Sequence, residues 1–345
     1  MRKWLRRLVR VELVLILLVI VAGSVVRMTG SGMGCPDWPK CFGYLIPPTE
    51  RSTLDWHPGR AFKEGNIIIH EEALYSAKAD FTAGEQLNLN NWEKYLKHDY
   101  AIFNPVHTWI EFLNRLLGAL SGLPMLAILV LSFFFLKDDL RIPLLAGSGL
   151  FMLGFEAWLG KKVVDGNLIP GSITIHMFGA LMIVGILLIL YQIVKGKSGQ
   201  TRYYTPGFRN LLVLGLLLAL SQILLGTQVR EQVDDLLRMG LSRAQTTESL
   251  ALTFYVHRSF SILILALNLY LWWYNRKQQF KFGELNAIMI LIGLEILLGI
   301  ILYYFDLPYF AQPAHLLLGA LLFAFQLQAV ISYYLGATKR VIPVS

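Results

Sequence analysis

Charged residues are scarce in this sequence, since Asp, Glu, Lys and Arg together make up 16% of its 345 residues. An ordinary soluble protein has roughly 25%. The two cysteines are too few for the disulfide framework of a small secreted module. Hydrophobic residues, at 55% of the chain, are too many for a disordered protein. The few charged residues, the few cysteines and the many hydrophobic residues exclude a soluble enzyme, a disulfide-rich module and a disordered chain.

The hydrophobic residues are grouped in blocks long enough to cross a membrane. A hydrocarbon core of ~30 Å needs about 20 apolar residues in a helix. The sequence therefore predicts an all-α, polytopic protein of the cell (inner) membrane. The first block could instead be a cleaved signal peptide, but its apolar stretch is longer than is typical of one. The eight predicted helices are residues 8–27, 107–136, 142–163, 172–194, 209–229, 251–274, 284–304 and 312–335.

The net charge of +8 comes from basic residues that flank the apolar blocks. We therefore expect these residues to contact membrane lipid, and we expect no nucleic-acid partner. These residues cluster before the first block and after the fourth, sixth and eighth blocks. The positive-inside rule places such segments in the cytoplasm. Both termini are therefore predicted to be cytoplasmic, and the long loop 28–106 is predicted to be extracytoplasmic.

The two halves of the chain resemble each other. One offset of 139 residues separates Glu156 from Glu295 and His176 from His315. Four helices per half is an even number, so the repeats are predicted to be parallel, related by an axis along the membrane normal. The predicted domains are two fused four-helix bundles, an N-terminal one over residues 1–200 and a C-terminal one over residues 201–345.

Ionisable residues inside membrane helices are costly and are therefore candidates for function. By the predicted topology, His176, His257 and His315 lie roughly 5–10 Å below the outer membrane boundary. Two imidazoles on facing helices of a bundle can hold an iron porphyrin. His257 and His315 belong to the second and fourth helices of the C-terminal bundle, which predicts a haem between them. Hydrogen-bonded packing histidines are the alternative.

The N-terminal bundle departs from this pattern, because Asn114 occupies the position that corresponds to His257. One strong axial ligand, His176, with an open face suits oxygen chemistry, whereas two histidines suit electron transfer. Glu111, one turn before Asn114, is the candidate catalytic group at that open face. An ion pair with Arg115 at i,i+4 is its alternative role. The sequence thus predicts one reactive haem site and one redox haem site.

Several arginines could pair with porphyrin propionates. These are Arg27, Arg115, Arg230 and Arg258. Anchoring in lipid headgroups is the alternative for Arg27 and Arg230. Cys35 and Cys41, in the extracytoplasmic loop, are spaced for a disulfide that serves either as a structural staple or as a redox relay. Glu12, near the cytoplasmic end of the first helix, is expected to snorkel to water.

Four motifs resemble the haem A synthase family (Cox15/CtaA type). They are the segment from Thr29 to Pro39, Glu111-Phe112-Leu113-Asn114-Arg115, His257-Arg258 and Pro313-Ala314-His315. The resemblance implies that a ring methyl of haem O is oxidised to the formyl group of haem A for cytochrome oxidase biogenesis. Haem O synthase, cytochrome oxidase assembly factors and an electron donor that the sequence does not name are the implied partners.

The resemblance also implies roles for individual residues. A haem b is expected between His257 and His315, while haem O is expected in the N-terminal bundle with His176 as its ligand and Asn114 and Arg115 beside it. Glu111 matches the family's essential glutamate. Asn114 replaces the histidine that the family has in this motif.

Two other classes of protein remain open. A di-haem b-type cytochrome that only transfers electrons would need saturated ligation in both bundles, which Asn114 argues against. A transporter built from parallel repeats would favour broken helices and polar residues near the midplane. The ionisable residues of this chain instead cluster toward the predicted outer side.

Overall fold

The computed structural model describes residues 1–96, 102–165, 171–196, 201–335 and 338–341. The chain divides into two compact units, each described by itself below. Unit 1 comprises Met1–Val21, Leu120–Glu156 and Ile173–Ser345, and unit 2 comprises Ala22–Ala119 and Ala157–Ser172. Residues 97–101 of the predicted extracytoplasmic loop and residues 197–200 at the predicted domain boundary lie outside the described residues.

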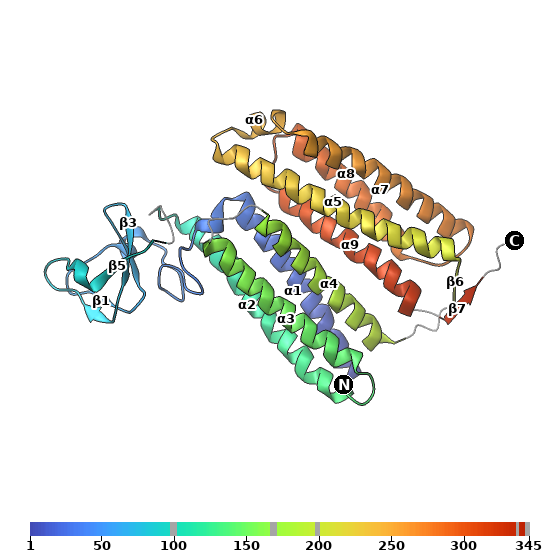
Figure 1. Cartoon of the computed structure of the whole chain (residues 1–345), viewed down its shortest axis with the longest axis horizontal. Helices are drawn as coiled ribbons and strands as arrows, with labels where there is room; N and C mark the ends of the chain where they lie inside the picture. Colours follow the sequence, from blue (N-terminus) through green and yellow to red (C-terminus); the bar gives the residue numbers. More distant parts are fainter. Residues whose placement is uncertain (97–101, 166–170, 197–200, 336–337, 342–345) are drawn as a thin grey trace. The chain divides into compact units, whose positions relative to one another are not determined.

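Eight helices in the described part of the chain are long and apolar enough to cross a membrane (Figure 1), which confirms the predicted number. They are α1 (Arg2–Met28), α2 (Pro105–Ser132), α3 (Arg141–Asp165), α4 (Ser172–Lys195), α5 (Pro206–Arg238), α7 (Leu252–Lys277), α8 (Glu284–Tyr304) and α9 (Ala311–Leu335). The chain is therefore a mostly helical, multi-pass membrane protein.

Two of these helices extend more than five residues beyond a predicted end. Helix α1 begins at Arg2 rather than at residue 8, because its basic first turns are rich in good helix formers. Helix α5 continues to Arg238 rather than ending at residue 229. Within that extension Arg230 and Asp234 form an ion pair at i,i+4, with 2.6 Å between Nη2 and Oδ1, which stabilises a helix in water.

The short elements lie between the long helices, except for strand β7, which follows α9. They are the helix α6 (Arg243–Glu248) and the 3₁₀ helices η1 (Ser31–Met33), η2 (Arg51–Leu54), η3 (Leu89–Asn91) and η4 (Phe133–Phe135). Strands β6 (Thr201–Tyr204) and β7 (Thr338–Val341) pair in parallel. Helix α6 begins with a capping box, in which Ser242 and Gln245 satisfy each other's backbone N–H groups.

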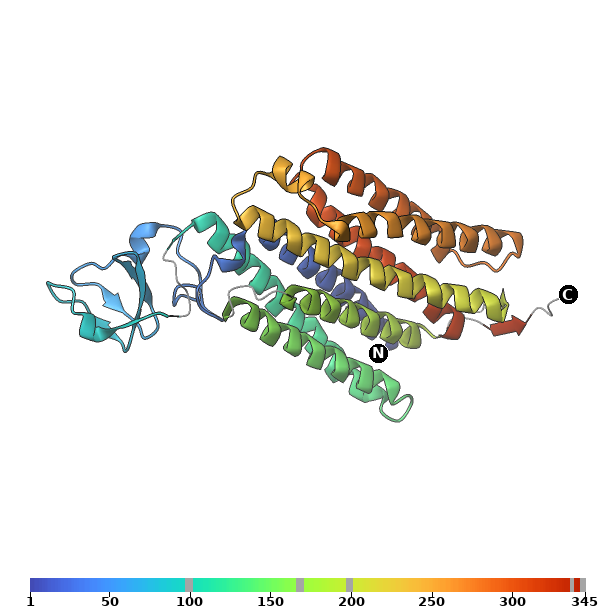
Figure 2. The ribbon, with the colours of Figure 1, turned by 45° about the horizontal axis from the view of Figure 1, so that its top comes forward.

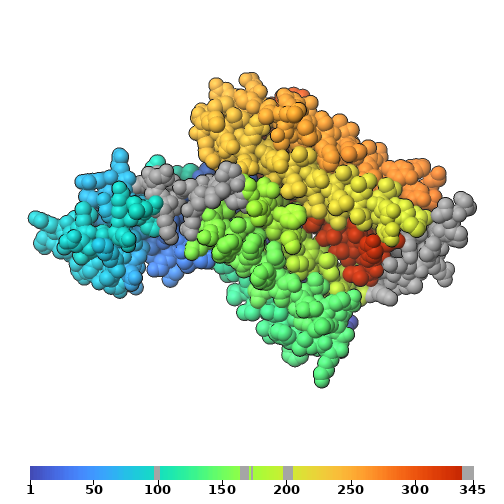
Figure 3. All heavy atoms as spheres, in the orientation of Figure 1, coloured from blue at the N-terminus to red at the C-terminus, as the bar shows by residue number. Residues whose placement is uncertain are grey.

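One hydrophobic core of unit 1 joins the unit 1 parts of α1, α2 and α3 to α4 and α9. Its buried members include Leu5, Ile16, Met125, Ile142, Leu187 and Phe323. Figure 3 shows α9, in red, between α4 and α5. Polar contacts add to this packing, as Thr174 donates a hydrogen bond of 3.0 Å to Thr227 Oγ1. The residues that pack α4 against α5 and α9 therefore belong to one continuous core.

A second core of unit 1 lies among α5, α7, α8 and α9. Helix α5 contacts α7 and α9, and α8 contacts the same two helices, so the four form a closed ring (Figures 1 and 2). Helices α7 and α9 lie diagonally across this ring. Its buried side chains include Phe208, Leu212, Leu271, Ile288 and Ala329. These four helices therefore pack around one hydrophobic core.

Unit 2 contains a β-structured insert, residues 44–96, for which the sequence predicted no fold. Its strands are β1 (Ala61–Phe62), β2 (Ile67–His70), β3 (Ala73–Ala77), β4 (Phe81–Thr82) and β5 (Trp92–Lys94). Strand β3 pairs antiparallel with β2 and β5, and β1 pairs antiparallel with β4. Phe62 and Trp92 pack in its core with ring centroids 4.9 Å apart. The insert therefore has a hydrophobic core of its own.

Glu12 corrects one sequence-based expectation. Its side chain does not snorkel to water, because the residue is 0% exposed within unit 1. Neither carboxylate oxygen has a hydrogen-bond partner among the described residues. The expectation was wrong because helix α1 places Glu12 on the face that also carries Leu5, Val9 and Ile16, and that face is packed against other helices.

Candidate functional site

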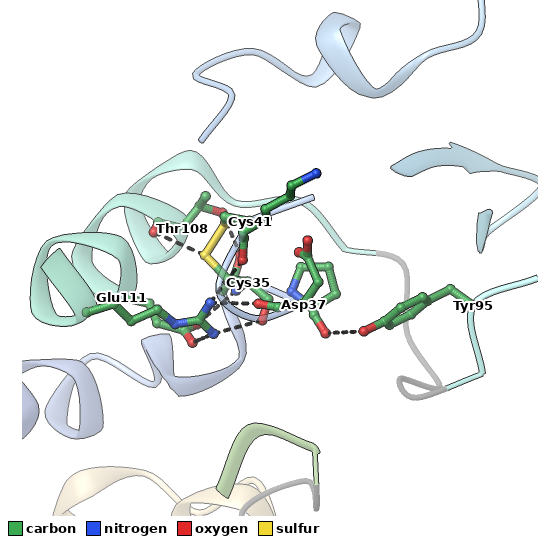
Figure 4. A network of polar contacts seen from close by, with 10 residues as sticks. Cys35, Asp37, Cys41, Tyr95, Thr108 and Glu111 are labelled. Carbon is green, nitrogen blue, oxygen red and sulfur yellow. Dashed lines mark hydrogen bonds and ion pairs between the residues drawn. A yellow bond between two sulfur atoms is a disulfide. The ribbon is translucent and has the colours of Figure 1, made fainter. Parts of the chain in front are cut away.

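The first polar centre lies in unit 2, where α2 meets the cysteine loop (residues 34–43). Glu111 Oε2 accepts a 2.8 Å hydrogen bond from the backbone N–H of Cys35. Its other oxygen, Oε1, pairs with Arg115 one turn later on the same helix. Glu111 is only 3% exposed. Both oxygens of this buried carboxylate therefore have partners, as Figure 4 shows.

Arg115 holds the same loop through its backbone carbonyl groups. Its Nη1 donates to Asp37 O at 2.7 Å and to Lys40 O at 3.1 Å, and its Nη2 donates to Cys35 O at 3.4 Å. A planar guanidinium can satisfy several acceptors at once because its N–H groups form a fixed fork. The ion pair that the sequence offered as an alternative role for Glu111 is thus present, and it extends into a clamp on the cysteine loop.

Cys35 and Cys41 form a disulfide, as predicted. Both residues are buried, and Thr108 of α2 donates a 2.8 Å hydrogen bond to Gly34 O beside them. A Cβ atom on Gly34 would lie 2.5 Å from His107 O, so only glycine permits this close approach of loop and helix. The loop is therefore fixed to α2 by covalent, polar and steric means.

Asp37 is the acidic residue of the cysteine loop, and its pKa is shifted from the ordinary value. Burial raises the pKa of this carboxyl, while hydrogen bonds from the backbone N–H groups of Gly43 and Phe42 and the charge of Arg115 act to lower it. The bond from Gly43 N to Asp37 Oδ2 measures 2.8 Å. The net upward direction means that desolvation outweighs these favourable contacts.

The second polar centre lies inside the ring of α5, α7, α8 and α9 in unit 1. His257 on α7 and His315 on α9 face each other across the diagonal, with ring centroids 6.4 Å apart and an angle of 78° between the planes. Gln222 of α5 donates a 3.0 Å hydrogen bond to His257 O. The structure thus brings these two predicted ligands together.

The spacing of this pair fits two axial ligands of one iron. Two histidine nitrogens at about 2.0–2.1 Å from a metal, on rings of about 1.1 Å radius, would set the centroids about 6.3 Å apart. A Cβ atom on Gly226 would lie 3.1 Å from His257 Cε1, so glycine at this position avoids a tight contact with the imidazole. Among the described residues no group of three His, Cys, Asp or Glu side chains could hold a bare metal ion. A porphyrin supplies the remaining ligands itself.

Two glutamates contact the imidazoles of His176 and His315, which the sequence did not predict. Glu295 Oε2 lies against His315 Nδ1, and Glu156 Oε2 lies against His176 Nδ1. Both pairs are within unit 1. The signal was available in the sequence, because the same offset relates the two glutamates and the two histidines, but the offset alone does not show that they touch.

The remaining predicted residues have varied surroundings. Asn114 belongs to unit 2, where its half-buried side chain lies near Gly23 of α1, and its Oδ1 has no hydrogen-bond partner in the described part of the chain. Arg27 is half-buried at the end of α1. Arg230 pairs with Asp234 and with Gln312. The exposed Arg258 packs over the rings of Phe254 and Tyr255, at 5.8 and 5.3 Å from the centroids.

These features define a polytopic membrane protein with an opposed histidine pair inside a helical bundle. The chain belongs to the COX15-CtaA family, described as cytochrome oxidase assembly protein, which matches residues 6–64 and 76–327.

Curated relatives carry a more specific name. A protein named Heme A synthase from Shewanella oneidensis is 26% identical over 222 residues, covering 64% of this chain and 54% of the relative. Heme A synthase from Orientia tsutsugamushi (strain Ikeda) is 24% identical over 349 residues, covering 88% and 89%. The one from Shouchella clausii is 24% identical over 286 residues, covering 79% and 77%. The match to the Shewanella protein thus spans about half the length of that relative.

Proposed function

We propose that this protein is a haem A synthase, an oxidoreductase that converts a ring methyl of haem O to the formyl group of haem A. The observation that carries the proposal is the His257–His315 pair, whose rings stand 6.4 Å apart within a chain of the COX15-CtaA family. Counted with water as the oxygen source, oxidation of methyl to formyl releases four electrons and four protons. Such a reaction needs both a substrate site and a route for electrons.

The C-terminal bundle, residues 201–345, is proposed to hold the redox site. His257 and His315 would bind a haem b, which supplies one-electron transfer when bound. Arg230 and Arg258 are candidates for its propionates. Arg258 is exposed and packs only over aromatic rings in the contacts described above, so its N–H groups are available to an anionic group.

The N-terminal bundle, residues 1–200, is proposed to hold haem O as substrate. His176 would be its single strong ligand, because Asn114 provides no imidazole. Arg27, Arg115 and Asn114 are proposed to line the site. The family description as a cytochrome oxidase assembly protein supports haem O synthase and other assembly factors as partners.

Glu111 is proposed to serve this site as an acid–base group. Its carboxylate already accepts one N–H and pairs with one guanidinium, so its charge is stabilised without water. These two contacts use two of the roughly four lone-pair sites of a carboxylate. The others leave Glu111 able to take up or release a proton while it still accepts the bond from Cys35 N.

The topology is part of the same proposal. The two bundles are proposed to be parallel repeats, with both termini in the cytoplasm and loop 28–106 on the other side. The basic residues in the first turns of α1 and those that follow α4, α7 and α9 support this orientation.

Expression of the full chain beside a source of haem O tests the function directly. Haems extracted from the membranes are separated and identified by mass, and haem A is the expected product. A chain that binds haem but leaves haem O unchanged would instead be an electron-transfer cytochrome. A purified chain without a Soret band would contradict both and favour a transporter.

A further inference from the structure

The two histidine–glutamate contacts of unit 1 have the same construction. In each, a histidine near the start of a helix meets a glutamate from the preceding long helix: His176 of α4 meets Glu156 of α3, and His315 of α9 meets Glu295 of α8. The glutamates are the buried members, with side chains 8% and 15% exposed, and the imidazoles are 44% and 29% exposed. In both pairs the contact involves Nδ1 of the imidazole.

Glycines on the histidine helices give both carboxylates space. A Cβ atom on Gly179 would lie 1.8 Å from Glu156 Oε1, and one on Gly319 would lie 3.5 Å from Glu295 Oε1. Glu156 therefore occupies room that any other residue at position 179 would fill. An acidic side chain is costly near the centre of a membrane helix. Two such placements in one protein indicate a role beyond packing.

The chemistry of imidazole points to that role. When one ring nitrogen donates its proton to a carboxylate, the other nitrogen is left unprotonated and free to bind a metal. The carboxylate also fixes the orientation of the ring and raises its strength as a ligand. A glutamate at Nδ1 thus leaves Nε2 as the ligand atom of His176 and His315.

His257 provides the contrast. Among the described residues no carboxylate pairs with its ring, as Glu156 and Glu295 do with His176 and His315, and the contact from Gln222 goes to its backbone carbonyl. The redox site would therefore have two unlike ligands: His315, which contacts a carboxylate, and His257, which does not. The substrate site would have only a ligand that contacts a carboxylate.

We propose that Glu295 and Glu156 are positioning residues that hold the Nδ1–H of His315 and His176, so that Nε2 of each faces iron as an electron-rich ligand. This inference rests on the proposed function, because it assumes that haem is bound at these histidines. It adds a carboxylate–histidine pair to the fourth long helix of each half. It also makes the two axial ligands of the redox haem unequal.

The test uses the purified full-length protein with its haem and compares E295Q with E284Q. Glu284 lies on the same helix and contacts Ser332 Oγ at 2.7 Å, so E284Q removes a charge from α8 away from the histidine. E295Q should keep a low-spin haem, shift its midpoint potential to more positive values, and lose haem to apomyoglobin about 10–100-fold faster. E284Q should match the wild type in both measurements.

Unchanged potential and unchanged haem loss in E295Q would overturn the proposal. If E295Q does not accumulate, E295D takes its place, because it keeps the charge but withdraws it from Nδ1 by one methylene. E295D should shift the midpoint potential and the rate of haem loss in the same directions as E295Q but by less. No change in either quantity would again overturn the inference. A wild-type protein that binds no haem would contradict the proposed function instead. In parallel, E156Q should weaken the binding of added haem O about 10–100-fold.

Discussion

Two corresponding segments, one in α2 and one in α7, use the same positions differently. In α2, Glu111 and Arg115 bind each other and the backbone of the cysteine loop. In α7 the position of Glu111 is taken by Phe254, which stacks on Tyr303 with ring centroids 5.0 Å apart. The polar residues of α2 fasten a loop, whereas those of α7 leave an imidazole facing a second imidazole. Similar sequence positions can therefore support a loop clamp in one half and an opposed histidine pair in the other.

The largest effect is expected in α7 and α9. Replacing His257 or His315 with Ala would remove one of the two proposed ligands, so the low-spin haem b proposed for this site should be lost. Optical spectra of the purified variants measure this. An unaltered low-spin spectrum in both single variants would contradict the ligand assignment and favour packing histidines.

The matched change in α2 is E111Q, which removes the charge but keeps the shape. Haem O, or a hydroxylated intermediate, should accumulate in place of haem A, while the haem at His257 and His315 stays intact. The protein should also lose up to about 3 kcal/mol of stability, since breaking a buried ion pair costs about 3–5 kcal/mol and Gln keeps a hydrogen bond.

Two measurements separate the roles of Glu111. Haem extraction reports catalysis, and hydrogen exchange at the Cys35 amide reports whether the loop is still held. If E111Q forms haem A at the wild-type rate but exchanges the Cys35 amide faster, Glu111 holds the cysteine loop and has no catalytic role.

The glycines beside the glutamates should respond unequally. G179A forces a methyl group into Glu156 and should cost about 1–3 kcal/mol, as overpacking does. G319A adds only an ordinary contact with Glu295 and should stay within about 0.5 kcal/mol. Thermal unfolding in detergent compares the two. Equal losses would show that the two histidine–glutamate pairs are packed alike.

The smallest effect is expected from the disulfide. The paired change of Cys35 and Cys41 to Ser opens a short loop and should cost at most about 2 kcal/mol. Because both sulfurs are buried against α2, we expect haem A formation to continue in the part of the protein that stays folded. Loss of activity in a fully folded variant would favour the redox relay over the staple.

The sequence predicted those features that depend on local pattern. Eight apolar blocks gave eight membrane helices, and the spacing of Cys35 and Cys41 gave the disulfide. The i,i+4 spacing of Glu111 and Arg115 gave their ion pair. Each of these follows from a period or separation along the chain.

Features that depend on tertiary packing were not predicted. The burial of Glu12 depends on which face of α1 meets other helices. The contact of Glu156 with His176 depends on the absence of a side chain at Gly179. The insert was missed for another reason. Its strands are two to five residues long, so alternation is too brief to stand out from loop sequence.

The ends of that insert have a consequence for how the protein can vary. Phe42, just before the insert, and Phe103, just after it, pack edge to face with ring centroids 5.6 Å apart. Chain entry and exit are therefore neighbours, which is the arrangement that lets a module be added to a host fold without disturbing it. In evolutionary terms, the insert can lengthen, shorten or be exchanged while the membrane helices keep their sequence. An exchanged module would have to rebuild the ties to the cysteine loop, among them the bonds from Tyr95 Oη to Pro36 O at 2.7 Å and from Asn66 Nδ2 to Gly43 O at 3.1 Å.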